Sequence, residues 1–358
     1  MATLVFTAIG TVLGGPIGGA IGALVGQTAD ALIFKPGPRT GPRLTDLSVQ
    51  TSRYGAQIPR LYGRMRVAGT VIWATDLKEA SATSGGGKGR PSVTSYSYSA
   101  SLAVALSSRP IRGIGRIWAD GNLLRGTAGD FKAPVAACRI HDGAAGQAVD
   151  PLIAAAVGVT QAPAFRGLAY MVLEELQLAD FGNRIPSLTV EVIADEGSMM
   201  VSTVAGDLMR RDVAFLGETE PAVQGYAADG SDLGEAIGPL VDVHGLRWRE
   251  EGDEIQLVAR VETGRTLAAK RVVHAIDGEM ERPGEKRCLP LDEVPARLSV
   301  RHFDPARDYQ IGAQSAERPG PGQRSEELGL PAALAADPAR ALADRVLRAR
   351  LAGRRSLT

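Results

Sequence analysis

The segment VTSYSYSASLAVAL, residues 93–106, determines the fold class. Its first half alternates serine or threonine with larger side chains, and its second half is almost wholly apolar. Strict alternation is typical of a strand with one exposed face, and a continuous apolar run is typical of a strand buried on both faces. We therefore expect one long strand that runs from an exposed edge into a core.

Short strand-like segments continue on both sides of this one. Each is rich in apolar or β-branched residues and ends at glycine, proline or a polar turn, as strands of a β-rich domain do. They lie at residues 47–51, 58–67, 69–74, 167–174, 187–193 and 297–303. Between residues 83 and 91 the chain reads TSGGGKGRP, which is too polar and glycine-rich to pack. We expect the tip of a long hairpin there.

Two tighter hairpins are predicted from their turns. Asp120 and Gly121 accept the positive φ angles of a two-residue turn, and a polar turn at 251–253 has the same role later in the chain. The predicted strand pairs are 114–119 with 122–124, and 245–250 with 254–261.

Three helices are expected. Asp150 caps one at 151–157, because aspartate accepts the free amides of a first turn and the proline that follows it tolerates this position. Asp232 caps a second helix at 233–240. The third begins near Asp337 and is amphipathic. Its apolar side carries Leu342, Val346, Leu347 and Leu351.

Composition and these segments together indicate an α+β chain that is mostly β. The 358 residues are 44% hydrophobic, enough for a sizeable core, and 43 glycines with 5% aromatic residues favour turns and short strands. Basic and acidic residues both number 40, so no net charge attracts nucleic acid. We expect several domains: an apolar glycine-rich arm at 1–34, a β-rich domain at 35–195, a small α+β domain at 196–300, and a strand, linker and C-terminal amphipathic helix at 301–358.

The N-terminal arm contains a regular ladder of glycines in GTVLGGPIGGAIGALVG, residues 10–26. If this segment is helical, glycines four apart form a bare ridge against which another helix packs closely. The seven glycines cost such a helix about 6–7 kcal/mol in water, so it requires lipid or identical neighbours. A flexible apolar arm packed against its own domain is the alternative. The ladder, our candidate for oligomer or membrane contact, comprises Gly10, Gly14, Gly18, Gly22 and Gly26.

The residues indicate no enzyme, no metal site and no cofactor. The GGGKG loop lacks the Ser or Thr of a phosphate loop, and the adjacent Glu174 and Glu175 end a predicted strand and point to opposite faces. His302 with Asp304 and Asp308 is the nearest approach to a metal cluster, and we interpret it as structural. The other histidines and the two cysteines show no ligand spacing: His141, His244, His274, Cys138 and Cys288.

A set of longer stretches is more informative than any single residue. In chain order they are IPRLYGRMR (58–66), VIWAT (71–75), GGGKG (85–89), TSYSYSASLAVA (94–105), RIWADG (116–121), FRGLAY (165–170), FGNRIP (181–186), VRHFDPARDY (300–309) and RPGP (318–321). In this order they resemble the tail-tip or baseplate-hub proteins of long-tailed bacteriophages and of gene transfer agents, which are phage-derived particles. Larger members of the gene transfer agent branch carry a TIM-barrel-like insert between the two halves, and here residue 195 runs directly into the second half.

The resemblance implies a homotrimeric hub at the virion tail tip, assembled in the bacterial cytoplasm. Such a hub closes the distal tail tube and takes part in host attachment and DNA delivery, without specific nucleic-acid binding. It implies contacts with the distal tail protein, the tape measure protein, tail fibres and other hub proteins. Three glycine ladders on a threefold axis would pack ridge to ridge, and the uncharged arms would enter a host membrane on release.

Two alternatives explain the same residues differently. Residues 1–29 carry no charged side chain, which is long enough for one membrane span, so a membrane-anchored bacterial β-rich binding protein fits. A carbohydrate hydrolase of the tail requires paired carboxylates in a cleft, and the sequence places none.

Overall fold

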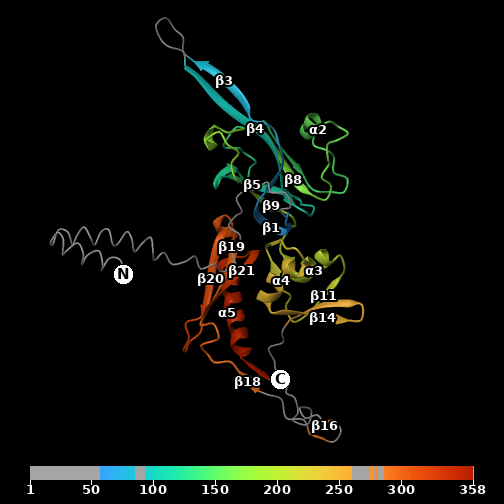
Figure 1. Cartoon of the computed structure of the whole chain (residues 1–358), viewed down its shortest axis with the longest axis vertical. Helices are drawn as coiled ribbons and strands as arrows, with labels where there is room; N and C mark the ends of the chain where they lie inside the picture. The colour runs from blue at the N-terminus through green and yellow to red at the C-terminus, as the bar shows by residue number, and fades with distance from the viewer. Residues whose placement is uncertain (1–56, 85–92, 260–274, 277–278, 281–285, 358) are drawn as a thin grey trace, which may run out of the picture. The chain divides into compact units, whose positions relative to one another are not determined.

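The computed structural model of the protein describes residues 57–84, 93–259, 275–276, 279–280 and 286–357. These residues all belong to one compact unit, Leu44–Thr358. The glycine ladder, the strand predicted at 47–51 and the hairpin tip at 85–92 lie outside the described residues. Strands outnumber helices and form several sheets, which confirms the α+β, mostly β prediction (Figure 1).

Short strands follow one another along the chain and are interrupted by a few helices. The strands are β1 (Arg60–Ala68), β2 (Thr70–Ala74), β3 (Lys78–Ser84), β4 (Val93–Ser107), β5 (Gly113–Ala119), β6 (Asn122–Arg125), β7 (Ala137–His141), β8 (Ala169–Gln177), β9 (Leu188–Ile193), β10 (Met199–Met200), β11 (Val213–Leu216), β12 (Ala222–Val223), β13 (Gly225–Ala228), β14 (Leu246–Glu251), β15 (Glu254–Ala259), β16 (Ala275–Ile276), β17 (Glu279–Met280), β18 (Lys286–Cys288), β19 (Arg297–Asp304), β20 (Gln310–Glu317), β21 (Ser325–Ala333) and β22 (Arg355–Leu357). The helices are α2 (Pro151–Val157), α3 (Val201–Met209), α4 (Leu233–His244) and α5 (Ala336–Ala352), with short 3-10 turns η1 (Ala179–Phe181) and η3 (Pro305–Arg307).

Strand β4 is the centre of a five-stranded sheet in the order β2-β4-β8-β7. Its apolar inner half pairs with β2 on one side and with β8 on the other, and residues 102–106 are buried. Its outer half pairs with β3, which lies off this order, from Lys78 opposite Ser99 to Ser84 opposite Val93. The long strand and the long hairpin predicted from the sequence are both confirmed, and the hairpin extends beyond the other strands of the sheet (Figure 1).

The second large sheet has eight strands in the order β20-β19-β21-β13-β1-β9-β5-β6. Strand β1 changes partner along its length. Residues 60–63 pair with β13, and residues 64–68 pair with β9. The sheet therefore joins strands from both sides of residue 195 through β1, while the domain boundary at 195 stays a prediction.

Glycine is required where β1 changes partner. Gly63 has a φ of +64°, and a Cβ there would lie 2.2 Å from the carbonyl oxygen of Gln224. A Cβ on Gly225 would lie 1.9 Å from the carbonyl oxygen of Arg64. Both contacts are to backbone atoms, so a side chain at either position forces the strands apart.

The buried side chains form two main cores. One lies between the five-stranded sheet and strands β1, β5 and β9, and includes Leu102, Leu173 and Val190. The other packs α3, α4 and α5 against β13, β19 and β21, and includes Tyr226, Leu240 and Leu342. Aliphatic residues dominate both cores, because their side chains pack closely and carry no polar atoms that would need partners.

The sequence identified the helix starts more accurately than one of the helix ends. The carboxylate of Asp150 accepts the Leu152 and Ile153 amides at the start of α2, and that of Asp232 accepts the Glu235 amide at the start of α4. The prediction that α4 ends at 240 is wrong. The helix continues past Pro239 to His244, because buried Val243 extends its apolar stripe, and Gly245 then ends it with a φ of +65°.

The prediction that strand 167–174 ends at Glu174 is also wrong. Gly167 has a φ of +81°, so β8 begins only at Ala169 and continues to Gln177. Glu175 has a φ of +51° and forms a bulge, at which the register with β4 shifts by one residue before the pairing continues to Gln177. The two-residue turn at Asp120 and Gly121 is confirmed by φ angles of +49° and +84°.

We predict that Gly225→Ala lowers the free energy of unfolding by about 3 kcal/mol, because the new Cβ collides with the Arg64 carbonyl and the backbone must move. Urea unfolding followed by circular dichroism measures the change. Gly113→Ala is the matched control, since its strand position has no atom within 4 Å of the new Cβ. An equal effect of the two substitutions would contradict the close-approach account.

A second prediction concerns pH. Burial, and then the nearby charge of Arg345, lower the pKa of His244 from 6.5 to about 4. Because the unfolded chain binds this proton more readily, stability is lost as the pH falls from about 6.5 to 4. His244→Phe removes the titration. We expect the free energy of unfolding of this variant to rise relative to wild type by about 2 kcal/mol between pH 7 and pH 4.5. A difference that stays constant with pH would show that His244 is not buried in its neutral form.

Candidate functional site

Glu174, Glu175 and His302, which the sequence analysis considered for catalysis or metal binding, each lie in a separate structural contact. Glu174 pairs with Arg139, and Glu175 pairs with Lys78. His302 is fully buried over Gly312, where a Cβ would lie 3.0 Å from the imidazole ring. Within the residues that the structure describes, no group of three or more His, Cys, Asp or Glu is placed to hold a metal ion. Among the same residues, no helix is long and apolar enough to cross a membrane.

The most extensive polar site is a junction where the β19–β20 turn inserts against β1, β5 and β9. Asp308 and Tyr309 form the tip of this turn, both with left-handed φ angles of +53° and +59°. Tyr309 is only 3% exposed and belongs to the core between the five-stranded sheet and strands β1, β5 and β9. Its hydroxyl donates to Glu191 Oε1 on β9 over 3.2 Å.

Two arginines hold the tip from the other strands. Arg66 on β1 donates from Nη1 to the Asp308 carbonyl over 3.0 Å and from Nε to Thr189 over 2.9 Å. Arg116 on β5 donates to the Asp308 carboxylate and, over 2.9 Å, to Glu191 Oε2. The two guanidinium groups also contact the Trp118 ring, at 3.9 and 4.9 Å from its centroid.

Electrostatics explain why this buried charge is tolerated. Burial by itself raises the pKa of Glu191, and the hydrogen bonds from Arg116 outweigh this effect and hold the pKa below its usual range. Burial, and then the Glu191 charge, raise the pKa of Tyr309, so its hydroxyl stays protonated and donates. Glu191, Asp308 and Arg116 therefore each have an opposite charge beside them, as buried charges require, whereas Arg66 donates to two neutral oxygens.

A second network secures the other end of β1. Asp195 accepts two hydrogen bonds from Arg109, of 2.7 and 2.8 Å, and a third of 3.0 Å from the amide of Gly63. The Asp195 carboxylate therefore accepts the hydrogen bond of the Gly63 amide, which does not donate to a neighbouring strand. Asp207 on α3 accepts from Arg60 Nη2 over 2.8 Å and from the Tyr62 hydroxyl over 2.7 Å. Helix α3 is thus bonded to the same strand.

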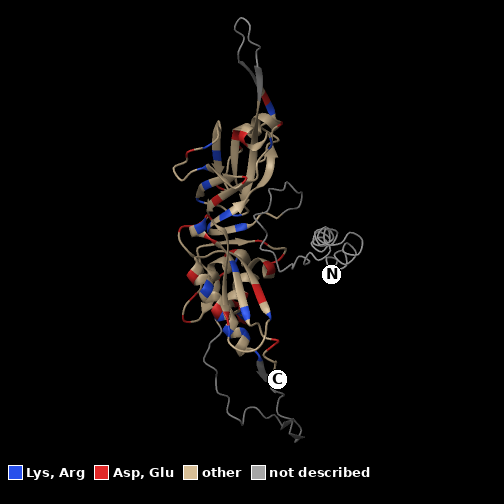
Figure 2. Cartoon of the chain, turned by 90° about the vertical axis from the view of Figure 1, so that its left-hand side faces the viewer, with Lys and Arg blue, Asp and Glu red and all other residues tan. Residues whose placement is uncertain are grey.

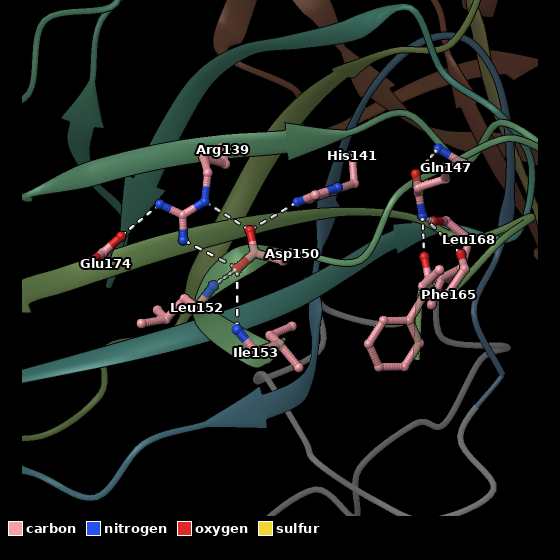
Figure 3. Close-up of polar contacts among 11 residues, drawn as sticks. Arg139, His141, Gln147, Asp150, Leu152, Ile153, Phe165, Leu168 and Glu174 are labelled. Carbon is pink, nitrogen blue, oxygen red and sulfur yellow. Dashed lines mark hydrogen bonds and ion pairs between the residues drawn. The ribbon is translucent and has the colours of Figure 1, made fainter. Parts of the chain in front are cut away.

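A third cluster fixes helix α2 to the outer face of the five-stranded sheet (Figure 3). Asp150 is fully buried and accepts from Arg139 Nε over 2.7 Å and from His141 Nε2 over 3.0 Å. Arg139 and His141 are two residues apart on β7, so both point to the face that α2 covers. Burial by itself raises the pKa of Asp150, but the Arg139 and His141 hydrogen bonds outweigh this and lower it to about 2.

The segment around α2 is held by an amide as well. The Gln147 side chain donates to the carbonyls of Ala164, Phe165 and Leu168 and accepts from the amide of Gly143 (Figure 3). The Tyr170 ring stacks on His141 at a centroid distance of 4.2 Å and meets Phe165 edge on at 5.4 Å. Residues from the FRGLAY stretch therefore complete the α2 cluster.

These sites are suited to holding segments together rather than to chemistry. They combine buried ion pairs with hydrogen bonds to backbone carbonyls and amides, and they place no nucleophile next to a general base. On the surface, basic and acidic residues are interspersed in the part that the structure describes (Figure 2). In the sequence Arg66, Arg116 and Tyr309 belong to separate stretches, and the structure brings them together. Sequence reasoning missed Glu191, whose signal was a lone charge inside the apolar strand LTVEVI.

Comparisons with known proteins agree with this picture. Residues 234–358, from α4 to the C-terminal end of the chain, match the model of a family described as putative phage tail protein. The fold is similar to a chain in a solved structure described as the virion of a native gene transfer agent (GTA) particle, with a TM-score of 0.72 and 26% sequence identity. That alignment covers 96% of this chain and 85% of the other. No curated protein matches the sequence.

The fold and the interlocked sites define a mostly β protein with two main cores joined through one sheet. The family match and the structural likeness support, more narrowly, a protein of the phage-tail type that serves as a structural component of a phage-like tail.

We predict that Tyr309→Phe lowers the free energy of unfolding by about 1–2 kcal/mol, because the buried Glu191 carboxylate loses a donor. Tyr98→Phe is the matched control. Its hydroxyl also donates to a glutamate, Glu79, but at an exposed site, so the expected loss is below about 0.5 kcal/mol. Chemical unfolding measures both. Equal losses would show that the junction contributes no more than a surface contact.

We also predict that Asp150→Asn destabilises the protein by about 3 kcal/mol at pH 7, because Arg139 and His141 lose a buried anion. Since the pKa of Asp150 is lowered to about 2, its contribution is present above about pH 4 and is lost as the pH falls toward 2. Thermal unfolding should show that the difference in melting temperature between variant and wild type becomes smaller from pH 7 to pH 3. Asp130→Asn, at an exposed pair with Lys132, should change stability little at any pH.

Proposed function

We propose that the protein is a hub subunit of a phage-like tail tip. In this role it closes the distal end of the tail tube as a homotrimer and takes part in host attachment and DNA delivery. It meets the distal tail protein, other hub proteins, the tape measure protein and tail fibres, and it is assembled in the bacterial cytoplasm before it becomes part of the virion.

One observation carries the proposal. The similarity to a chain of the gene transfer agent virion extends over 96% of this chain, so it includes both halves of the fold and the junction between them. The junction adds a physical argument. A tail subunit must transmit load without separating, and three networks here tie distant segments to β1 and to the five-stranded sheet.

The proposed parts of the chain follow the sequence-based division. The arm at 1–34 is the assembly or membrane segment, with Gly10, Gly14, Gly18, Gly22 and Gly26 as its contact ridge. The regions 35–195 and 196–300 are the hub domains, and 301–358 supplies the turn and helix that bind them together. Three copies of the arm on a threefold axis shield one another's apolar surface until a host membrane is reached.

The first experiment is light scattering of the full chain in detergent-free buffer, beside a variant that begins at Arg39. A trimer for the full chain and a monomer for the shorter one would make the glycine ladder the assembly device. If both forms are trimers, the folded region carries assembly and the arm remains for membrane contact. Liposome flotation of the arm then tests that contact.

Other outcomes count against the proposal. A full chain that is soluble only in detergent supports the membrane-anchored β-rich binding protein. A monomer for both forms, at concentrations up to the millimolar range, contradicts the homotrimer. Gly14→Leu with Gly18→Leu is a matched change in the arm, because it keeps the apolar character and removes the bare ridge. We expect it to weaken a ladder-dependent trimer at least tenfold.

A further inference from the structure

Among the residues that the structure describes, strand β20 lies at an edge of the eight-stranded sheet, and its backbone pairs with β19 alone. It is eight residues long, roughly 26 Å at about 3.3 Å per residue, and its sequence QIGAQSAE contains no proline or lysine. The opposite edge, β6, is four residues long and is covered by a bridge between Arg125 and Phe131.

This difference between the two edges is informative. Natural sheets protect long edges with lysine, proline, bulges or a covering segment, because unpaired amides and carbonyls pair with any strand that approaches. Strand β20 has none of these devices in its own sequence. Its small side chains, exposed Ala313 and half-buried Ala316 among them, obstruct an incoming chain little.

A groove of about 740 Å³ lies between α5 and the last three residues of β20. The helix contributes Asp337, Arg340, Ala341 and Asp344, which are spaced i, i+3, i+4 and i+7 and so form one stripe. The strand contributes Ser315, Ala316 and Glu317. The core-facing side of α5 is separate from this stripe and carries Leu342, Val346 and Leu347.

The groove is acidic. Its lining has three carboxylates and one arginine, a balance of two negative charges. Asp344 pairs with Arg348 over 2.6 Å, and Glu317 lies 3.7 Å from Arg297 at an exposed site. Asp337 forms no ion pair with any residue that the structure describes. Two of the three carboxylates thus already have an arginine beside them, and Asp337 is the lining carboxylate that a cationic partner can pair with.

We propose that β20 accepts an additional strand: an extended, lysine- or arginine-bearing segment of another protein of the assembly, which lies in the groove against α5. The edge supplies backbone hydrogen bonds, and the acidic stripe of α5 selects the charge of the partner. The proposal rests on the proposed role in a multi-protein tail, and it adds the surface and the chemistry of one partner contact.

A second copy of this chain fits the groove less well. Antiparallel pairing of β20 with itself relates the two copies by a twofold axis perpendicular to the sheet, so both α5 helices lie on the same face. The α5 stripes of both copies then carry like charges on one face of the joined sheet, which opposes the pairing. A cationic strand relieves this repulsion.

The test uses the full chain and a fluorescent eight-residue peptide of alternating lysine and threonine, with an alternating glutamate and threonine peptide as the charge control. Fluorescence anisotropy gives affinity, and hydrogen exchange with mass spectrometry gives the position. We expect the cationic peptide to bind at least tenfold more tightly and to slow exchange in residues 310–317. N-methylation of alternate peptide amides should abolish binding, because it removes the donors that a sheet edge needs.

Variants of the protein distinguish charge-selective binding in the groove from nonspecific binding of the peptide. Asp337→Asn with Asp344→Asn should weaken the cationic peptide about fivefold at low salt, with the melting temperature measured alongside. Glu250→Gln with Glu251→Gln on exposed β14 is the matched control and should change affinity less than twofold.

Four results would overturn the proposal: equal affinity for both peptides, protection outside β20, no binding, or a β20 edge already protected by self-association. The last would assign the edge to a second copy. None of them alters the light-scattering test of the hub role, so the two proposals fail separately.

Discussion

Strand β1 belongs to two antiparallel ladders, and the backbone contact at Gly63 and Gly225 makes this possible. A Cβ on either glycine would collide with a carbonyl oxygen of the facing strand, so only glycine allows the approach. The Gly63 amide leaves the ladder there and is recovered by Asp195. Without this crossing, β13 and β9 would have no common neighbour, and the two main cores would not share a sheet.

The charged networks stabilise what the crossing brings together. Arg66 and Arg116 reach the β19–β20 tip from two strands, and Glu191 stays ionised between Arg116 and Tyr309. Such pairs contribute less to net stability than apolar packing of the same volume would, but they are costly to break singly and they define one geometry. A protein that must keep its shape while neighbours bind and pull benefits from that property.

The same molecule combines fixed and open elements. Helix α2 is bonded to its sheet through a buried aspartate, whereas β20 pairs on one side only within the described part of the chain and lies beside a groove lined by α5. A single polypeptide that only needed to fold would protect such an edge. The contrast agrees with the proposal that β20 pairs with a strand of another protein.

The sequence by itself determined the elements whose cause lies within a few residues. Alternation and then a continuous apolar run identified β4, Asp150 and Asp232 located two helix starts, and Asp120 with Gly121 located a tight turn. It missed helix α3, whose sequence VSTVAGDLM contains weak helix formers. It also missed β7, β13, β20 and β21, since short or small-residue strands carry little local signal. Only the tertiary structure decided that Arg66 meets Asp308, 242 residues away, and that β1 serves two ladders. Those contacts depend on which strands become neighbours, and residue spacing does not encode that choice.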